Sequence, residues 1–382
     1  MSLRKTPKTP VPITSSREIL VVGLNPAFQS TLHLDNFRPG HVNRAARKCN
    51  SIGGKGQNFA IACSQYGETD KITVLQMTGG MTGSYIVSYL DELSIEHITI
   101  PISKTTRTCT TVLDKKTGSM TELIEPAGRI EIKERQILEE TIKKIVPNSK
   151  RLEGIALCGT LPPGLSGSTY SLIAQLKPDD CVVLLDAYQN IECLNTRKVN
   201  ILKINSEESR KLVGAHEDMD LVDVAKTILQ QYQLRILAIT DGPSTAYLFE
   251  QGAQTKMHTY DIPSLESVIQ DYDFSNSPLS SSITSSLPEA TGEAFQSRVG
   301  SHQNLASMGD SQDLLLNPLG AGDTCSAIFL LEYLDTKNAS LAYQHGLAAA
   351  SASCLMIDNT SHFDKRIKEL IFDQITMETS IL

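Results

Sequence analysis

The sequence lacks three features, and each absence excludes a class of protein. None of its eight cysteines belongs to a CxxC pair, which argues against structural zinc, and most sit in apolar runs, which favours reduced cysteines and a reducing compartment. No apolar run reaches transmembrane length, and no apolar signal-peptide core stands near the N-terminus. Basic residues are not in excess: the formal net charge is −8, which argues against nucleic acid or an anionic membrane as the main partner. We therefore expect a cytoplasmic protein.

Composition predicts one ordered domain over 18–382, because hydrophobic residues make up 40% of the chain. Residues 1–17 contain three prolines and no acidic residue, and we expect a flexible tail there, with a short transit peptide as the alternative. Residues 264–313 are serine-rich and aperiodic, which predicts a disordered insertion within the domain.

Apolar runs alternate with helical patterns along most of the chain, which predicts a mainly parallel sheet covered by helices on both faces. The predicted strands are 19–24, 72–77, 154–158, 181–186, 200–204 and 235–240. The predicted helices are 55–66, 82–93, 131–145, 167–176, 206–213, 219–231 and 322–335, with a further small-residue helix around 347–354.

Two polar regions interrupt this alternation. Residues 28–50 suit short, half-exposed strands rather than core strands. Residues 107–113 and 120–124 flank a turn at Lys116-Thr117-Gly118 and predict a β-hairpin. Together these regions predict a small separate sheet.

The most informative stretch is Gly320-Ala321-Gly322-Asp323, which precedes an apolar helix. Glycines allow a tight turn with bare N–H groups, and the helix N-terminus adds positive potential, so the turn predicts an anion site. Asp323 would place a base beside that site, as phosphoryl transfer to a hydroxyl requires. The alternative is a simple glycine turn in which Asp323 caps the helix.

A second glycine-rich turn covers 51–58 and opens the helix 55–66. Lys55 and Asn58 would project at its N-terminus, where they suit an oxygen-rich ligand. No Ser or Thr follows Lys55 as a Walker A loop requires, and a tight packing turn is the alternative. Further turns at 158–164 and 240–243 follow strands, and ligands of open α/β sheets bind at such carboxyl ends.

These pieces, in this order, resemble the PfkB (ribokinase-like) carbohydrate kinases, closest to the branch of 1-phosphofructokinase and tagatose-6-phosphate kinase. The likeness runs from about residue 19 to about residue 360, apart from the insertion, and seven weak motifs in the right order make it specific. The motifs are Leu24-Asn25-Pro26-Ala27, Pro39-Gly40-His41-Val42-Asn43-Arg44, Gly53-Gly54-Lys55-Gly56-Gln57-Asn58, the lid segments at 106–108 and 121–126, Gly159-Thr160-Leu161-Pro162-Pro163-Gly164, Asn205-Ser206-Glu207-Glu208 and Gly320-Ala321-Gly322-Asp323.

The resemblance implies a three-layer α/β/α ribokinase-like domain with a small β-sheet lid (about 28–50 and 104–125), ATP as donor and Mg²⁺ as helper. It also implies a homodimer through the lid sheet. Carried over to this sequence, the implied catalytic groups are Asp323 as base and the N–H groups of Gly320, Ala321 and Gly322 as anion hole.

The implied binding residues fall into two groups. The sugar phosphate would contact Gln29, Gly54, Lys55, Asn58, Gly159 and Arg107, with Arg44 as a weaker candidate for its phosphate. The nucleotide and Mg²⁺ would contact Lys203, Asn205, Glu208, Thr240, Gly242 and Thr245.

Three departures from the family pattern bear on substrate. Gln29 stands where the family has an aspartate that holds sugar hydroxyls, and Thr245 replaces a second glycine of the nucleotide turn. The insertion immediately precedes the catalytic turn. The sequence thus predicts a kinase of a phosphorylated ketohexose, most simply fructose 1-phosphate. The alternatives are a kinase of a free sugar or nucleoside, and a catalytically silent sugar-phosphate binder.

Overall fold

A computed structural model of the protein describes residues 18–149, 151–270, 316–356 and 360–382. The predicted tail (1–17) and residues 271–313 of the predicted insertion lie outside these ranges. Residues 265–270 do not belong to a disordered insertion: they form helix α7 (Leu265–Gln270), in which Leu265 and Val268 are buried. Two apolar side chains three residues apart on one helical face were too weak a signal to mark this helix.

The centre of the domain is a ten-stranded sheet in the order β14-β13-β12-β11-β10-β9-β8-β1-β4-β5. The strands from β11 to β5 in that order are parallel, whereas β12, β13 and β14 continue the sheet antiparallel. The bounds are β1 Glu18–Val22, β4 Ile72–Thr78, β5 Glu96–Pro101, β8 Leu152–Cys158, β9 Val182–Asp186, β10 Ile201–Asn205, β11 Ile236–Asp241, β12 Thr245–Glu250, β13 Lys256–Asp261 and β14 Thr376–Ile381.

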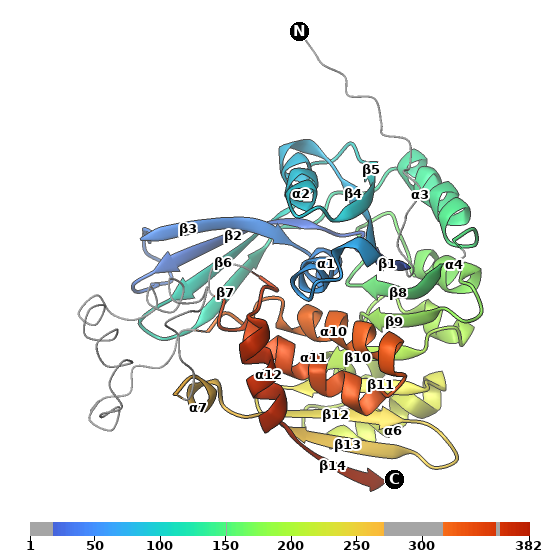
Figure 1. Ribbon diagram of the computed structural model, residues 1–382. Helices are drawn as coiled ribbons and strands as arrows, with labels where there is room; N and C mark the ends of the chain where they lie inside the picture. The colour runs from blue at the N-terminus through green and yellow to red at the C-terminus, as the bar shows by residue number, and fades with distance from the viewer. Residues whose placement is uncertain (1–17, 150, 271–315, 357–359) are drawn as a thin grey trace, which may run out of the picture.

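Helices cover both faces of this sheet, which confirms the predicted three-layer α/β/α domain (Figure 1). On one face lie α1 (Lys55–Gln65), α2 (Gly80–Glu92), α7, α10 (Ala321–Thr336), α11 (Ala339–Ser353) and α12 (Lys365–Gln374). On the other lie α3 (Ile132–Ile145), α4 (Ser168–Leu176), α5 (Ser206–Val213) and α6 (Leu221–Tyr232). Within the described ranges, no helix combines the length and apolar character needed to cross a bilayer.

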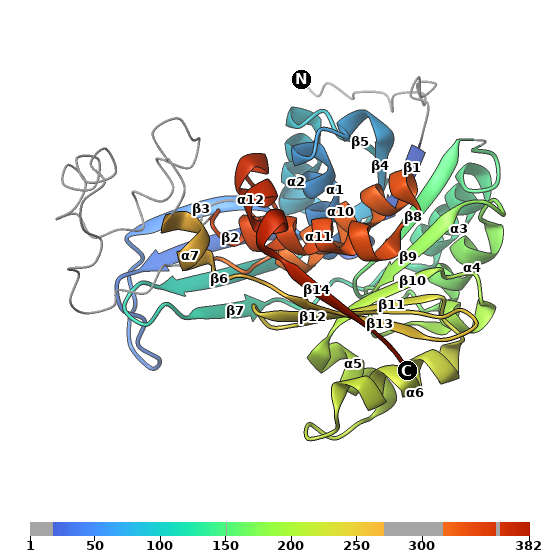
Figure 2. The same ribbon diagram turned by 60° about the horizontal axis from the view of Figure 1, so that its bottom comes forward.

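A separate four-stranded sheet, the lid, projects from the domain in both views (Figures 1 and 2). Its order is β3-β2-β6-β7, with bounds β2 Ala27–Leu34, β3 Arg47–Gly53, β6 Thr108–Asp114 and β7 Met120–Ile124. The predicted hairpin is confirmed as β6 and β7. The prediction of half-exposed strands is wrong for β2, because β2 lies between β3 and β6 and most of its side chains are buried.

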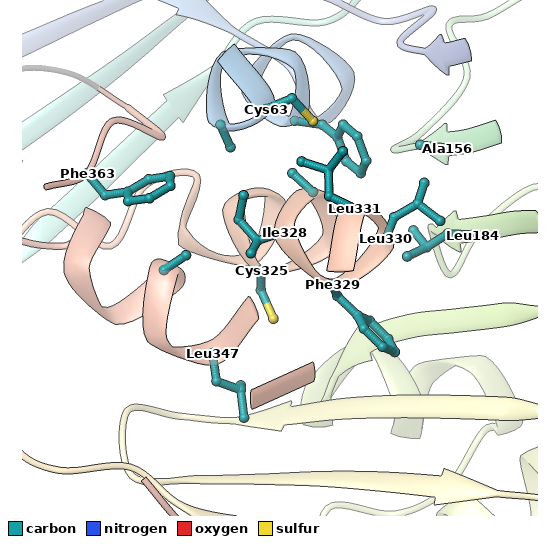
Figure 3. Close-up of a cluster of buried hydrophobic side chains, with 14 of the residues drawn as sticks. Cys63, Ala156, Leu184, Cys325, Ile328, Phe329, Leu330, Leu331, Leu347 and Phe363 are labelled. Atoms are coloured by element: carbon teal, nitrogen blue, oxygen red, sulfur yellow. The ribbon is translucent and has the colours of Figure 1, made fainter. Parts of the chain in front are cut away.

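Helix α10 lies in the middle of the larger apolar core. Ile328, Phe329, Leu330 and Leu331 follow one another around the helix, and all four are buried (Figure 3). A helix that is apolar on every side must be surrounded, and α10 packs against α1, α11 and the sheet. The turn that begins α10 is therefore fixed by a helix with no exposed apolar face.

Close packing of α10 on α11 generates a test of this core. A Cβ added at Gly346 of α11 would lie 2.7 Å from the carbonyl oxygen of Cys325. Gly346→Ala should therefore lower the free energy of unfolding by about 1–3 kcal/mol through overpacking, although alanine favours helices. Gly252→Ala is the matched control, because the nearest atom to its added Cβ is 3.6 Å away. Equal unfolding midpoints of the two variants in urea would contradict this account.

Candidate functional site

A cavity of about 1310 Å³ lies between the lid and the carboxyl ends of the sheet strands. Ligand sites of open α/β sheets occupy this edge, because loops from successive parallel strands converge there. The cavity is lined by all but two of the predicted site residues: Gln29, Gly54, Lys55, Asn58, Arg107, Gly159, Lys203, Asn205, Glu208, Thr240, Gly242, Gly320, Ala321, Gly322 and Asp323.

The two remaining predicted residues are Arg44 and Thr245. Arg44 is exposed on the loop between β2 and β3, and Thr245 is the first residue of β12, paired with Asp261. Neither is among the described residues that line the cavity. Their assignment rested on position within a motif, which does not determine the direction of a side chain.

The glycine turn before α10 has the predicted shape. Gly320 adopts the left-handed φ of 80°, and an added Cβ there would lie 2.6 Å from the Ser361 hydroxyl, so only glycine fits. The N–H group of Ala321 donates to the Pro318 carbonyl at 3.1 Å and is therefore already committed in this structure. Helix α10 begins at Ala321, which places Asp323 in its first turn.

Asp323 does not cap its helix, which removes the alternative interpretation of this residue. The N-cap of α10 is Gly320, and no side chain bonds the first-turn N–H groups. The Asp323 carboxylate instead accepts a hydrogen bond of 2.7 Å from the Asn58 amide nitrogen. Burial and the neighbouring charge of Asp186 raise the pKa of Asp323 to about 7, and the Lys55 ammonium opposes this rise.

Asp186 does not line the cavity but contacts residues that do, and the sequence analysis missed it. It ends β9, it is buried, and it accepts hydrogen bonds from Lys55 Nζ at 2.6 Å and from the Ser326 hydroxyl. Lys203 Nζ lies 3.9 Å away. Burial alone would raise the pKa of Asp186, but the two lysines outweigh it and the pKa is lowered. Its position at the carboxyl end of a predicted strand was the available signal.

The two lysines tie this carboxylate to both glycine turns. Lys55 Nζ, from α1, also lies 3.1 Å from Glu208, so it bridges two carboxylates of different elements. Lys203 Nζ, from β10, donates to the Gly322 carbonyl at 3.0 Å. The charged cluster therefore connects the first turn of α1, β9, β10 and the first turn of α10.

Asn205 and Glu208 cap the N-terminus of α5. The Asn205 side-chain oxygen accepts from the Glu208 N–H at 2.7 Å, and the Glu208 carboxylate accepts from the Asn205 N–H at 3.0 Å. This reciprocal pair is a capping box. Within the described part of the chain, no group of three or more His, Cys, Asp or Glu side chains is placed to hold a metal ion.

Arg107 is the cation at the lid end of the cavity. It immediately precedes β6, is half-buried, and donates from Nη2 to the Asn25 carbonyl at 3.2 Å. Its Nε is buried and has no hydrogen-bond partner among the described residues. Nearby, Gln29 is buried and donates to the Thr111 hydroxyl at 2.9 Å. The lid thus brings a guanidinium and an amide to the cavity.

The chain is similar in sequence to known carbohydrate kinases. The family described as "pfkB family carbohydrate kinase" matches residues 17–268. Tagatose-6-phosphate kinase from Staphylococcus epidermidis is 28% identical over 216 residues, which cover 56% of this chain and 67% of that protein.

Two solved structures share the fold. Phosphofructokinase-2 from Escherichia coli, in complex with substrates and products, has a TM-score of 0.69 at 18% identity, covering 94% of this chain and 99% of its own. A possible 1-phosphofructokinase from Thermotoga maritima has a TM-score of 0.66 at 16% identity, covering 95% and 100%. At these identities the likeness establishes the fold alone.

The opposite pKa shifts of the two buried aspartates predict opposite effects on stability. A carboxyl with a raised pKa binds its proton more tightly in the folded state, so stability falls as pH rises from about 4 to about 7. Asp323→Asn avoids this loss and should raise the melting temperature at about pH 8, with no gain at about pH 4. Asp186→Asn should lower the melting temperature at about pH 8, since the lowered pKa reports a favoured charge. Calorimetry at both pH values measures this, and a destabilised Asp323→Asn protein at high pH would contradict it.

Proposed function

The chain belongs to the pfkB family of carbohydrate kinases, and on that premise we propose that it transfers the γ-phosphoryl group of ATP to a hydroxyl of a phosphorylated ketohexose. Fructose 1-phosphate, converted to the 1,6-bisphosphate, is the simplest candidate. Such a substrate carries its phosphate at one end and the reacting primary hydroxyl at the other. The site must then offer an anion-binding group at a distance from the base.

The observation that supports the proposal most directly is the position of the Arg107 guanidinium at the lid end of the cavity. The Arg107 guanidinium lines the cavity and is half-buried, and its one hydrogen bond to the described residues comes from Nη2, so the guanidinium has further N–H groups to offer a ligand. Guanidinium groups bind phosphate through two parallel charge-assisted hydrogen bonds, and the Asn25 carbonyl holds this one in place. The relatives include a tagatose-6-phosphate kinase and a phosphofructokinase, and both names agree with a phosphorylated sugar as substrate.

Asp323 supplies the base. As the substrate hydroxyl oxygen attacks the γ-phosphorus, the bond to the bridging oxygen of ADP breaks and the hydroxyl proton passes to the Asp323 carboxylate. A pKa near 7 suits this task, because the carboxylate is ionised in part at neutral pH and still holds a proton well. The N–H groups of Gly320 and Gly322, at the N-terminus of α10, would face the charge of the moving phosphoryl group.

The residues near Glu208 fit a magnesium ion. Mg²⁺ binds through one or two carboxylates and keeps its other positions for water and substrate phosphates, so it does not need a cluster of three acidic side chains. Glu208, in the first turn of α5, and Asn205, the last residue of β10, both line the cavity and would hold the ion. The ion would neutralise charge on the phosphates of ATP. Thr240 and Gly242, at the end of β11, would border the nucleotide.

The role of Asp323 predicts both a rate and a pH profile. Asp323→Asn should keep the fold but lower kcat by roughly 10²–10⁴, the usual contribution of a positioned base. In the wild-type protein, kcat/KM should fall as pH drops through about 7, because protonation of Asp323 removes the base. A coupled assay of ADP release across the pH range measures both. A variant with more than half of the wild-type kcat would remove Asp323 from the mechanism.

The role of Arg107 separates phosphosugar from free-sugar chemistry. Arg107→Ala should cost about 2–4 kcal/mol in kcat/KM for fructose 1-phosphate, as loss of one partner of a bound charge pair does. Arg107→Lys should already raise KM, since an ammonium cannot form the paired contact. The affinity for ATP should change little.

The control substrate is free fructose and the control variant is Arg135→Ala. Arg135 faces Glu139 on α3 and does not line the described cavity, so kcat/KM should match the wild type. Small and equal losses of Arg107→Ala on fructose and on fructose 1-phosphate would favour a kinase of a free sugar or nucleoside instead. Absence of ADP release with every sugar tested would favour a silent sugar-phosphate binder.

A further inference from the structure

Gln57 occupies the first turn of α1 between two site residues, yet its side chain points into the protein. Lys55 and Asn58 reach toward the charged cluster, whereas Gln57 is fully buried. Its amide nitrogen donates to the Gly23 carbonyl at 3.0 Å and to Gln76 Oε1 at 2.9 Å. The first bond joins the start of α1 to the loop that follows β1.

The hydrogen bonds continue away from the cavity. Gln76, on β4, donates from Nε2 to the Thr99 hydroxyl on β5 at 2.9 Å. Thr99 in turn lies 2.9 Å from Nδ1 of His97. Gln57, Gln76 and Thr99 therefore form a polar relay from the first turn of α1 to the edge of the large sheet. Such a relay is expensive to bury unless its members satisfy one another, and among these three side chains only Gln57 Oε1 lacks a hydrogen-bond partner within the described residues.

The direction of the relay is fixed at its inner end. The Gly23 carbonyl can only accept, so the amide nitrogen of Gln57 must face it. That nitrogen also faces Gln76, which must then present its oxygen to Gln57 and its nitrogen to Thr99. Neither amide can be reversed without bringing two acceptors or two donors together. The relay thus holds Gln57 in one orientation.

The start of α1 is packed in the core but has no side-chain cap. Its N-cap is Gly54, and no side chain caps the helix. Gly56 packs against Gly23 so closely that an added Cβ would lie 2.4 Å from the Gly23 Cα. This contact limits how near the two segments can come, but it does not prevent the helix from sliding or tilting. The two buried hydrogen bonds from Gln57 to Gly23 and Gln76 oppose sliding and tilting of the helix.

We propose that Gln57, and Gln76 through it, are positioning residues of the active site. They hold the first turn of α1 so that Lys55 meets Asp186 and Asn58 meets Asp323. Neither glutamine touches the reacting atoms. The proposal rests on the proposed function for its kinetic consequences but not for its structural ones, and the two are tested separately.

Displacement of the first turn of α1 should change the pKa of Asp323, which a general loss of stability would not do. The hydrogen bond from Asn58 is one of the interactions that lower the pKa of Asp323, against burial and Asp186, which raise it. The other charged groups facing Asp323 are Lys55 and Lys203, which also lower its pKa. Misplacement of Asn58 and Lys55 should therefore move the acid limb of kcat/KM to higher pH. It should also lower kcat by roughly 10–10², as small displacements of catalytic groups do.

The test uses volume-conserving variants of the full-length protein. Gln57→Met and Gln76→Met remove the hydrogen bonds and should both show the shifted acid limb and the lower kcat. Gln76→Glu should instead keep the wild-type pH profile and kcat. A buried carboxyl stays protonated, so it can accept a hydrogen bond from Gln57 and donate one to Thr99. Leu138→Ala, on α3 in the opposite core, is the control for lost stability alone, with a lower melting temperature and an unchanged acid limb.

Amide hydrogen exchange gives a readout that needs no substrate. The Asn58 N–H bonds to the Gly54 carbonyl in the first turn of α1, and it should exchange faster in Gln57→Met than in Leu138→Ala. Where Gln57→Met does not fold, Thr99→Val removes the outer acceptor and should produce a smaller shift in the same direction. Wild-type kcat, acid limb and Asn58 exchange in the folded relay variants would overturn the proposal. An inactive wild-type protein would overturn the proposed function and leave the exchange result to decide the relay.

Discussion

Two buried carboxylates, Asp186 and Asp323, interact with the same two lysines, Lys55 and Lys203. Two positive charges near two buried acids cannot favour both equally, and this sets the pKa of each carboxyl. Asp186 receives the shorter contacts, with Lys55 at 2.6 Å and Lys203 at 3.9 Å, and its pKa is lowered. Burial raises the pKa of Asp323, the charge of Asp186 raises it further, and the same lysines oppose this rise only in part. Neighbouring carboxyl groups whose environments separate their pKa values divide the work of a site. Here Asp186 is the permanent anion, and Asp323 is the group that can exchange a proton.

This arrangement explains why both glycine turns stand where they do. An added Cβ at Gly322 would lie 3.0 Å from Lys203 Nζ, and one at Gly56 would meet the Gly23 backbone. The first close approach lets a buried lysine reach the turn before α10, and the second brings α1 against the end of β1. The missing side chains at these positions leave room for lysines from β10 and α1 to converge on one carboxylate. The glycines therefore serve charge placement as well as backbone conformation.

The sequence predicted the parts of the fold that follow from local pattern. Parallel strands with long apolar runs and the turns at their carboxyl ends were predicted, since those ends meet at one edge of the sheet. The antiparallel strands β12, β13 and β14 were not predicted. Strands β13 and β14 lack a continuous apolar run, whereas β12 contains one at 246–249 that the sequence analysis overlooked. Asp186 was missed for a different reason: its neighbours Lys55, Lys203 and Ser326 come from distant parts of the chain, and no local motif marks their meeting.

The ionised form of Asp323 destabilises the folded protein, and helix α10 cannot move to relieve this. A raised pKa means that the folded protein opposes the charge of Asp323, which makes the carboxylate a local source of instability near neutral pH. A surface helix would shift or fray at its first turn to expose such a group. Helix α10 is buried from Asp323 to Leu331, and its apolar residues pack against α1, α11 and the sheet (Figure 3). Displacing its first turn would cost apolar contacts along the whole helix. The core therefore keeps Asp323 in an unfavourable place, and the proposed reaction needs its proton acceptor at that place.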